Sequence, residues 1–139
     1  MREIKFRAWY KPYKQMCQVE SLRFDGNGVY TAVLIEEPFY DRKLVKADEI
    51  AIEQFTGLKD MNGTDIYEGD IVSLRLWGSN GYEYENGIVR YYPPSAAFKW
   101  FSLEDDENDC NNYWLQHADS DGREVVGNIH ENPELVEEK

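Results

Sequence analysis

Six dipeptides that favour tight turns divide this chain into short segments, and they constrain its fold more than any other feature. Asparagine precedes glycine four times and aspartate precedes glycine twice, at Asn27, Asn62, Asn80, Asn86, Asp25 and Asp121. Both dipeptides supply the positive φ angles that two-residue β-hairpin turns require. An aromatic fraction of 14% provides bulky side chains for a small core. The sequence therefore predicts a mainly β fold built from antiparallel hairpins.

The segments between these turns have the periodicity of strands. Apolar residues at 4, 6 and 8 alternate with basic ones, and residues 29–35 are apolar on both faces, as in a central strand. Residues 72–76 and 98–100 also alternate, and residues 125–129 form a last short strand. Residues 46–55 favour a strand, although a turn of helix at 46–50 fits as well. Asn132 before Pro133 is typical of a helix N-cap, so we expect a short C-terminal helix.

Three runs of sequence carry a resemblance to a known family. They are MREIKFRAW at 1–9, FTGLKDMNGTDIYEGDIV at 55–72 and VVGNIHENPEL at 125–135. The second run has the punctuation of a β-hairpin, with Asn62 and Gly63 suited to a type I′ turn between two apolar stretches. Together the runs resemble the YopX family of phage and prophage proteins. This resemblance implies β domains of SH3-like type and a phage accessory role, and it carries over no catalytic or binding residue.

A reversal of charge near residues 36–48 suggests two domains. Residues 1–47 hold nine Lys and Arg against six Asp and Glu, a net charge of +3, whereas residues 48–139 hold six against 21, a net charge of −15. We expect an N-terminal β meander over 1–47 and an SH3-like β-barrel over 48–139, with a long acidic loop at 104–122. Phosphate groups repel such an acidic part, so direct nucleic-acid binding is not expected. An ordinary solvated surface, docking onto a basic partner and self-assembly all fit the charge split.

The sequence carries no pattern typical of an active site. It contains no phosphate-binding glycine loop and no nucleophile motif. Residues 60–65 resemble a calcium loop, but their glycine comes fourth rather than sixth, so a hairpin fits better. His117 and His130 lie in different segments, and we expect Cys17 and Cys110 to be free thiols. We therefore predict no catalytic, cofactor-binding or metal-binding residue and no cofactor, while a loosely held cation at 119–122 stays open.

The aromatic residues favour contact with other macromolecules. Four tyrosines, together with the N-terminal meander that carries Trp9, fit a seam between subunits: Tyr82, Tyr84, Tyr91 and Tyr92. Glu83 and Glu85, which stand among these tyrosines in the sequence, oppose the phosphate backbone of a single-stranded nucleic acid. We therefore expect a homo-oligomer that also binds a host or phage protein.

The functional prediction is a non-enzymatic phage or prophage accessory protein of the host bacterial cytoplasm. The opening residues lack a continuous apolar core, so no signal peptide is expected, and no apolar run approaches the ~20 residues needed to cross a bilayer. An acidic mimic of DNA that inhibits a host DNA-binding protein is the alternative. A metal-dependent hydrolase that uses the acidic loop is the third possibility.

Overall fold

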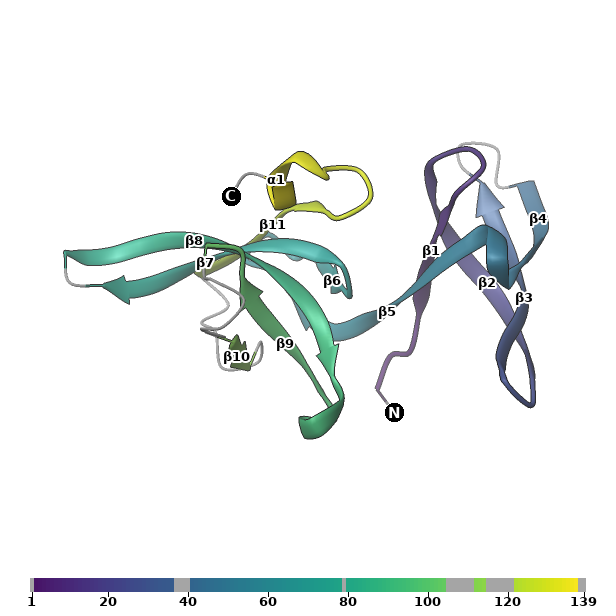
Figure 1. Cartoon of the computed structure of the whole chain (residues 1–139), viewed down its shortest axis with the longest axis horizontal. Coiled ribbons are helices and arrows are strands. Elements are labelled where there is room, and N and C mark those ends of the chain that lie inside the picture. Colours follow the sequence, from purple (N-terminus) through teal and green to yellow (C-terminus); the bar gives the residue numbers. More distant parts are fainter. Residues whose placement is uncertain (1, 37–40, 79, 105–111, 115–121, 138–139) are drawn as a thin grey trace. The chain divides into compact units, whose positions relative to one another are not determined.

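The computed structural model describes residues 2–36, 41–78, 80–104, 112–114 and 122–137. Strands dominate these residues and form two antiparallel sheets, shown in Figure 1, which confirms the predicted mainly β fold. The chain divides into two compact units, Met1–Phe55 and Thr56–Lys139. The assignment of residues 1–47 to a meander and of 48–139 to an SH3-like barrel stays a prediction.

The first unit is an antiparallel meander that returns to its own first strand. Its elements are β1 (Phe6–Tyr10), β2 (Gln15–Asp25), β3 (Gly28–Glu36), β4 (Asp41–Lys46), the 3-10 turn η1 (Ala47–Glu49) and β5 (Ile50–Lys59). The strand order is β4-β3-β2-β1-β5, and β5 continues into the second unit, where β6 (Asp65–Tyr67) follows it in the sheet. The strand predicted for 29–35 is confirmed as β3, which lies between β2 and β4.

The predicted strand over 46–55 is interrupted: Lys46 ends β4, Ile50 begins β5, and the turn of helix that also fitted 46–50 lies between them. Residues 47–49 form the helical turn η1 instead, because the Glu49 carboxylate accepts the backbone N–H of Lys46 (3.0 Å) and closes the turn. Side chains from strands β1 to β5 fill the first core: Ala8, Tyr10, Cys17, Ala32, Leu34, Val45 and Ile50. The buried Cys17 is in no disulfide, as predicted, whereas Cys110 lies outside the described residues.

The second unit is built on a five-stranded sheet. Its elements after β6 are β7 (Asp70–Gly78), β8 (Gly81–Tyr92), the 3-10 turn η2 (Pro93–Ser95), β9 (Ala97–Ser102), β10 (Asn112–Trp114), β11 (Arg123–Asn128) and α1 (Glu134–Glu137). The strand order is β10-β9-β8-β7-β11. The core of this unit contains Ile66, Val72, Leu74, Val89 and Trp100. The predicted strands at 72–76, 98–100 and 125–129 are confirmed as parts of β7, β9 and β11, although β11 ends at Asn128.

Helix is scarce, as the sequence predicts. The expected C-terminal helix is present as the single turn α1, and Pro133 precedes it. No helix among the described residues is long and apolar enough to span a membrane. Of the expected acidic loop at 104–122, only Glu104, Asn112–Trp114 and Gly122 are described, and Asn112–Trp114 pairs with β9 as strand β10.

The Asn-Gly pairs do not all form the turns that the sequence predicts. Among the described residues, positive φ angles outside glycine occur only at Lys14 and Ala96, so Asn62 has no positive φ and the predicted type I′ turn is wrong. In this pair the positive φ belongs to Gly63 alone, with a value of 79°. The pair Asn86-Gly87 makes no turn at all, because it lies inside β8. A Cβ at Gly87 would collide with the indole of Trp100, so this glycine provides room for a core side chain.

Candidate contact surfaces

The carboxylate of Asp60, which opens the calcium-like segment 60–65, holds a turn together. Its Oδ1 accepts the backbone N–H groups of Asn62 and Thr64, and its Oδ2 accepts that of Val125 in β11, each at 2.9 Å. Burial by itself would raise the pKa of Asp60, but these hydrogen bonds outweigh it and hold the pKa below its usual value. Asp60 therefore fastens the turn after β5 to β11, which favours a structural role.

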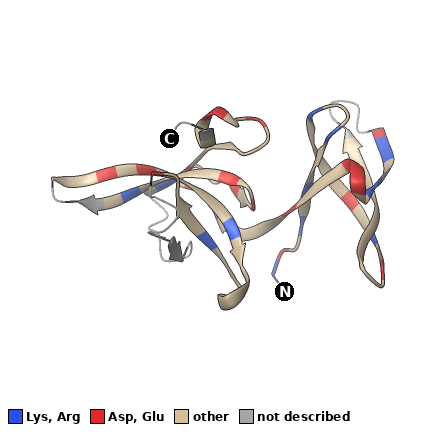
Figure 2. Ribbon diagram, viewed as in Figure 1, with Lys and Arg blue, Asp and Glu red and all other residues tan. Residues whose placement is uncertain are grey.

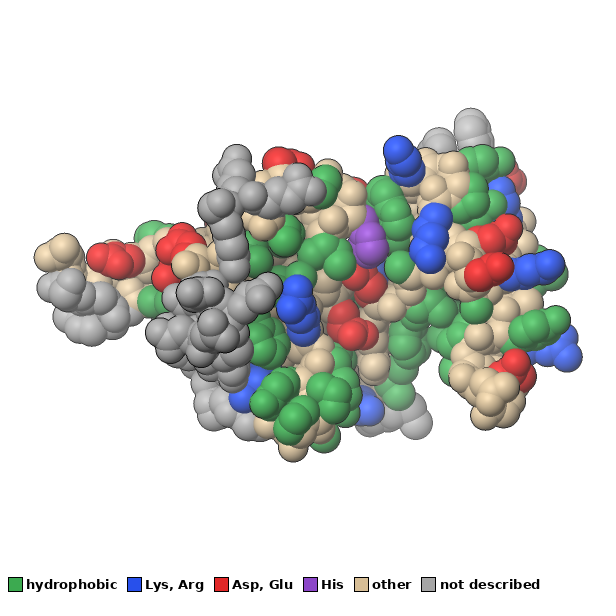
Figure 3. All heavy atoms as spheres, viewed as in Figure 1, with side chains coloured by type: hydrophobic (Ala, Val, Ile, Leu, Met, Phe, Trp, Pro, Cys, Tyr) green, Lys and Arg blue, Asp and Glu red, His purple; other side chains and the backbone are tan. Residues whose placement is uncertain are grey.

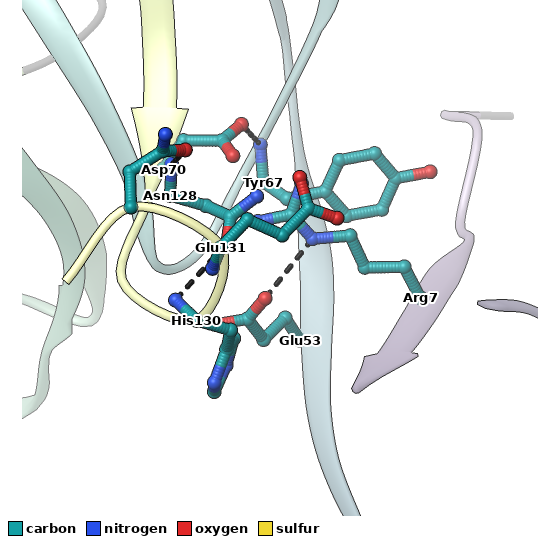
Figure 4. A network of polar contacts seen from close by, with 8 residues as sticks. Arg7, Glu53, Tyr67, Asp70, Asn128, His130 and Glu131 are labelled. Carbon is teal, nitrogen blue, oxygen red and sulfur yellow. Dashed lines mark hydrogen bonds and ion pairs between the residues drawn. The ribbon is translucent and has the colours of Figure 1, made fainter. Parts of the chain in front are cut away.

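The polar residues of the run at 125–135 form a second local network, drawn in Figure 4. Asn128 Oδ1 accepts the backbone N–H groups of His130 (3.0 Å) and Glu131 (2.8 Å), while Asn132 Oδ1 accepts the N–H of Asn128 (3.2 Å). Gly127 is required there, because an added Cβ would lie 2.6 Å from Asn132 Oδ1. The side chains of this run thus shape the chain reversal after β11, and His130 takes part through its backbone.

Buried carboxylates elsewhere also hold backbone or side chains in place. Asp70 is 1% exposed, and its Oδ2 accepts the N–H of Tyr67 at 2.8 Å. In the first unit, Arg7 Nε donates to Glu53 Oε1 at 3.0 Å (Figure 4). Among the described residues, no group of three or more His, Cys, Asp and Glu is arranged to hold a metal ion. His117 and residues 119–121 lie outside the described part, so the cation at 119–122 stays an open alternative.

The β7–β8 hairpin extends beyond its neighbours in the sheet. Strand β11 pairs with β7 from Asp70 to Leu74, and β9 pairs with β8 from Gly87 to Tyr92. The hairpin itself continues to the pair Gly78 and Gly81. Within the described residues, its distal part is therefore a two-stranded ribbon, visible in Figure 1 as the teal strands that run past β9. We call residues 75–78 and 81–84 the arm.

The arm carries exposed aromatic side chains beside an arginine. Tyr82 and Tyr84 are 60% and 69% exposed, and Arg75 lies opposite Tyr84 in the register. The guanidinium carbon of Arg75 is 4.7 Å from the centre of the Tyr82 ring, which is cation–π geometry. Glu83 stands between the two tyrosines and is exposed. Tyrosine and arginine on a regular strand are the residue types that dominate protein–protein contacts.

The edge strand of the first unit presents a second exposed surface. Among the described strands, β4 is the last in its sheet, and Leu44, at 72% exposure, lies opposite Val33 of β3. Leu44 points away from the core because its neighbour Val45 is buried. Arg42 and Lys46 share the face of Leu44, since side chains alternate along a strand. We call this surface the β4 face; it consists of Arg42, Leu44 and Lys46 with their partners Ile35, Val33 and Thr31.

Comparison with known proteins identifies the family. The family model described as YopX protein matches residues 5–137. The chain belongs to the YopX family. No curated protein matches this sequence. Two solved structures are similar over 99% of this chain and 100% of theirs: protein EF1440 from Enterococcus faecalis, with 28% identity and a TM-score of 0.65, and yopX from Bacillus subtilis, with 21% identity and a TM-score of 0.62.

In this YopX-family chain, the structure separates the aromatic residues that the sequence analysis grouped together. Tyr82 and Tyr84 lie on the arm, whereas Tyr91 and Tyr92 lie near the other end of β8, where they contact Phe98 and Phe101 of β9. Sequence reasoning missed Leu44, because an edge strand of composition DRKLVK gives little apolar periodicity. The local sequence holds no clear signal for Leu44, since Leu44 and Val45 are adjacent and charged residues stand on both sides of them.

Proposed function

We propose that this YopX-family chain is a phage or prophage accessory protein that acts by oligomerising and by contacting another protein. The arm is the observation that carries this proposal. It places Tyr82 and Tyr84 in solvent on a defined strand, with Arg75 stacked beside them. Figure 3 shows hydrophobic and acidic side chains side by side along the arm.

The energetics favour a contact role for such a ribbon. An isolated two-stranded ribbon is at best marginally stable in water, and a third strand or a packing surface stabilises it. Tyrosine side chains lose little conformational entropy when they are buried, because they have few rotatable bonds. A few such anchors contribute about 2 kcal/mol each to an interface. Burial of the arm in a partner therefore stabilises both the interface and the ribbon.

The direct test is the mass of the chain in solution. Sedimentation velocity from about 1 to about 100 µM covers the micromolar affinities expected of a modest interface. We expect the unmodified chain to associate and Tyr82→Ser/Tyr84→Ser to associate at least about tenfold more weakly, since about 1.4 kcal/mol corresponds to a factor of ten. The matched control is Tyr91→Ser, which removes an exposed tyrosine (48%) from the same strand outside the arm. A monomer at every concentration would contradict the proposal.

A further inference from the structure

The arm and the β4 face have complementary chemistry. The β8 segment Gly81–Glu85, whose first four residues belong to the arm, reads GYEYE and alternates tyrosine with glutamate, whereas β4 reads DRKLVK and contains three basic residues out of six. Figure 2 shows the acidic residues along β8 and the basic residues in β4. Opposite charges and exposed apolar side chains thus occur on two different strands of the same chain.

Both strands lie at the edge of a sheet in the described part of the protein. Strand β4 pairs with β3, and no described strand lies beyond it. Residues 81–84 pair with β7, and no described strand lies on their other side. Backbone groups at such edges are ready to pair with an added strand, which is the basis of recognition by β-augmentation.

The charges on β4 select the kind of strand that can be added. Lysine and arginine on an edge strand repel a second copy of the same edge, which limits uncontrolled sheet growth. An acidic strand meets no such repulsion. Leu44, 72% exposed opposite Val33, adds an apolar patch on which a tyrosine ring can pack.

We propose that the arm of one copy pairs with the edge strand β4 of a second copy, so that Tyr82 or Tyr84 covers Leu44 between Arg42 and Lys46, while Glu83, on the other face of the arm, lies beside the basic strand at Lys43. This inference rests on the proposed oligomerisation and names the two surfaces that form it. The second copy is the occupant that charge complementarity favours, because every copy carries both the acidic strand and the basic edge. When the arm of each copy pairs with β4 of the other copy, the two copies form a symmetric dimer with two identical interfaces.

A compensating charge exchange tests the pairing. Glu83→Lys/Glu85→Lys places basic residues on the acidic strand, and Arg42→Glu/Lys46→Glu places acidic residues on β4. We expect each variant alone to associate at least about tenfold more weakly than the unmodified chain, as measured for close charge pairs across interfaces. An equimolar mixture of the two variants should form a mixed dimer, because both of its interfaces again join opposite charges.

The matched control is Glu124→Lys/Glu131→Lys, which changes two exposed glutamates of the second unit outside the arm. Both Glu→Lys double variants shift the net charge from −12 to −8, since each substitution adds +2. A less negative net charge reduces the general repulsion between copies in both variants. Weaker association in the arm variant but not in the control must therefore arise from the local pairing. Circular dichroism with a melting curve verifies that each variant is folded.

Each outcome has one interpretation. Loss in both single-surface variants, recovery in the mixture and an unaffected control support the pairing. If dimers persist in both charge variants, the arm–β4 pairing is wrong and the proposed oligomerisation stands. The same conclusion follows if Tyr82→Ser/Tyr84→Ser abolishes the dimer while both charge variants still form it. An unmodified chain that stays monomeric overturns the oligomerisation and the pairing together.

Discussion

Replacement of Gly87 by alanine tests how the second unit is packed. Gly87 lies in the middle of β8, and its missing side chain leaves the space that the indole of Trp100 fills. Trp100 is fully buried, and its Nε1 donates to the carbonyl oxygen of Val72 at 2.8 Å. An added methyl group therefore forces the largest side chain of this core to move and breaks its hydrogen bond.

The expected cost follows from two contributions. Overpacking of a well-packed core costs about 1–3 kcal/mol. Loss of a buried hydrogen bond that leaves a carbonyl group unsatisfied costs about 1–3 kcal/mol more. We expect Gly87→Ala to lower the free energy of unfolding by about 3 kcal/mol, which is a large fraction of the stability of a small protein.

Urea unfolding followed by circular dichroism measures this change. The matched control is Gly26→Ala, because a Cβ at Gly26 meets no atom within 4 Å and the residue has no positive φ. We expect that control to stay within about 0.5 kcal/mol of the unmodified chain. Equal stability of Gly87→Ala and the unmodified chain would refute the inferred packing of Trp100 against β8.

Further substitutions test the two polar networks. Asp60→Asn should cost about 2 kcal/mol near neutral pH in urea unfolding, because a charged acceptor of three N–H groups is lost. The pKa of Asp60 in the folded protein lies below its usual 3.8, so the carboxylate stabilises the fold fully above pH 3.8 and progressively less as the pH falls through the folded pKa. The loss of stability in Asp60→Asn should therefore shrink in acid. A loss that is independent of pH would contradict this reasoning. Gly127→Ala and Asn132→Ala should each destabilise the chain. In melting experiments, the double variant should lose less stability than the sum of the two single losses, because the added Cβ meets Asn132 Oδ1 at 2.6 Å. Strict additivity would exclude that contact.

Much of the fold follows from period-two patterns in the sequence. Residues 72–76 form a strand whose apolar side chains at 72, 74 and 76 lie in or against the core, on the face that the alternation indicates. Lys99 shows where alternation fails: it lies on an alternating strand yet is buried, because its ammonium group packs 4.7 Å from the centre of the Tyr92 ring. Such a contact depends on the neighbouring strand and leaves no signal in the local sequence.

The dipeptide signals were correct about hairpins in general but not about each turn. At 60–63, the carboxylate of Asp60 organises the turn, so only Gly63 needs a positive φ. At Asn86-Gly87, the glycine serves the packing of Trp100, which lies 13 positions later in the sequence. A dipeptide pattern cannot distinguish glycine that bends the chain from glycine that makes room for a distant side chain.

The contact surfaces were only partly predictable. The tyrosines at 82 and 84 were recognised as candidates, but their position on a ribbon beyond β9 and β11 depends on where those strands end. Leu44 was missed because its neighbours are charged. Its exposure follows from the register with Val33 and from the burial of Val45, which only the sheet reveals.

Disulfide trapping between copies tests most directly which surfaces touch. One variant carries Leu44→Cys and another carries Tyr84→Cys, both in a chain with Cys110→Ser, and the two are mixed under mild oxidation. We predict a covalent pair of one copy of each variant, formed faster than in a mixture of Leu44→Cys with Tyr91→Cys. A mixture with Tyr84→Cys that cross-links no faster than the Tyr91→Cys mixture would contradict the placement of the arm against β4.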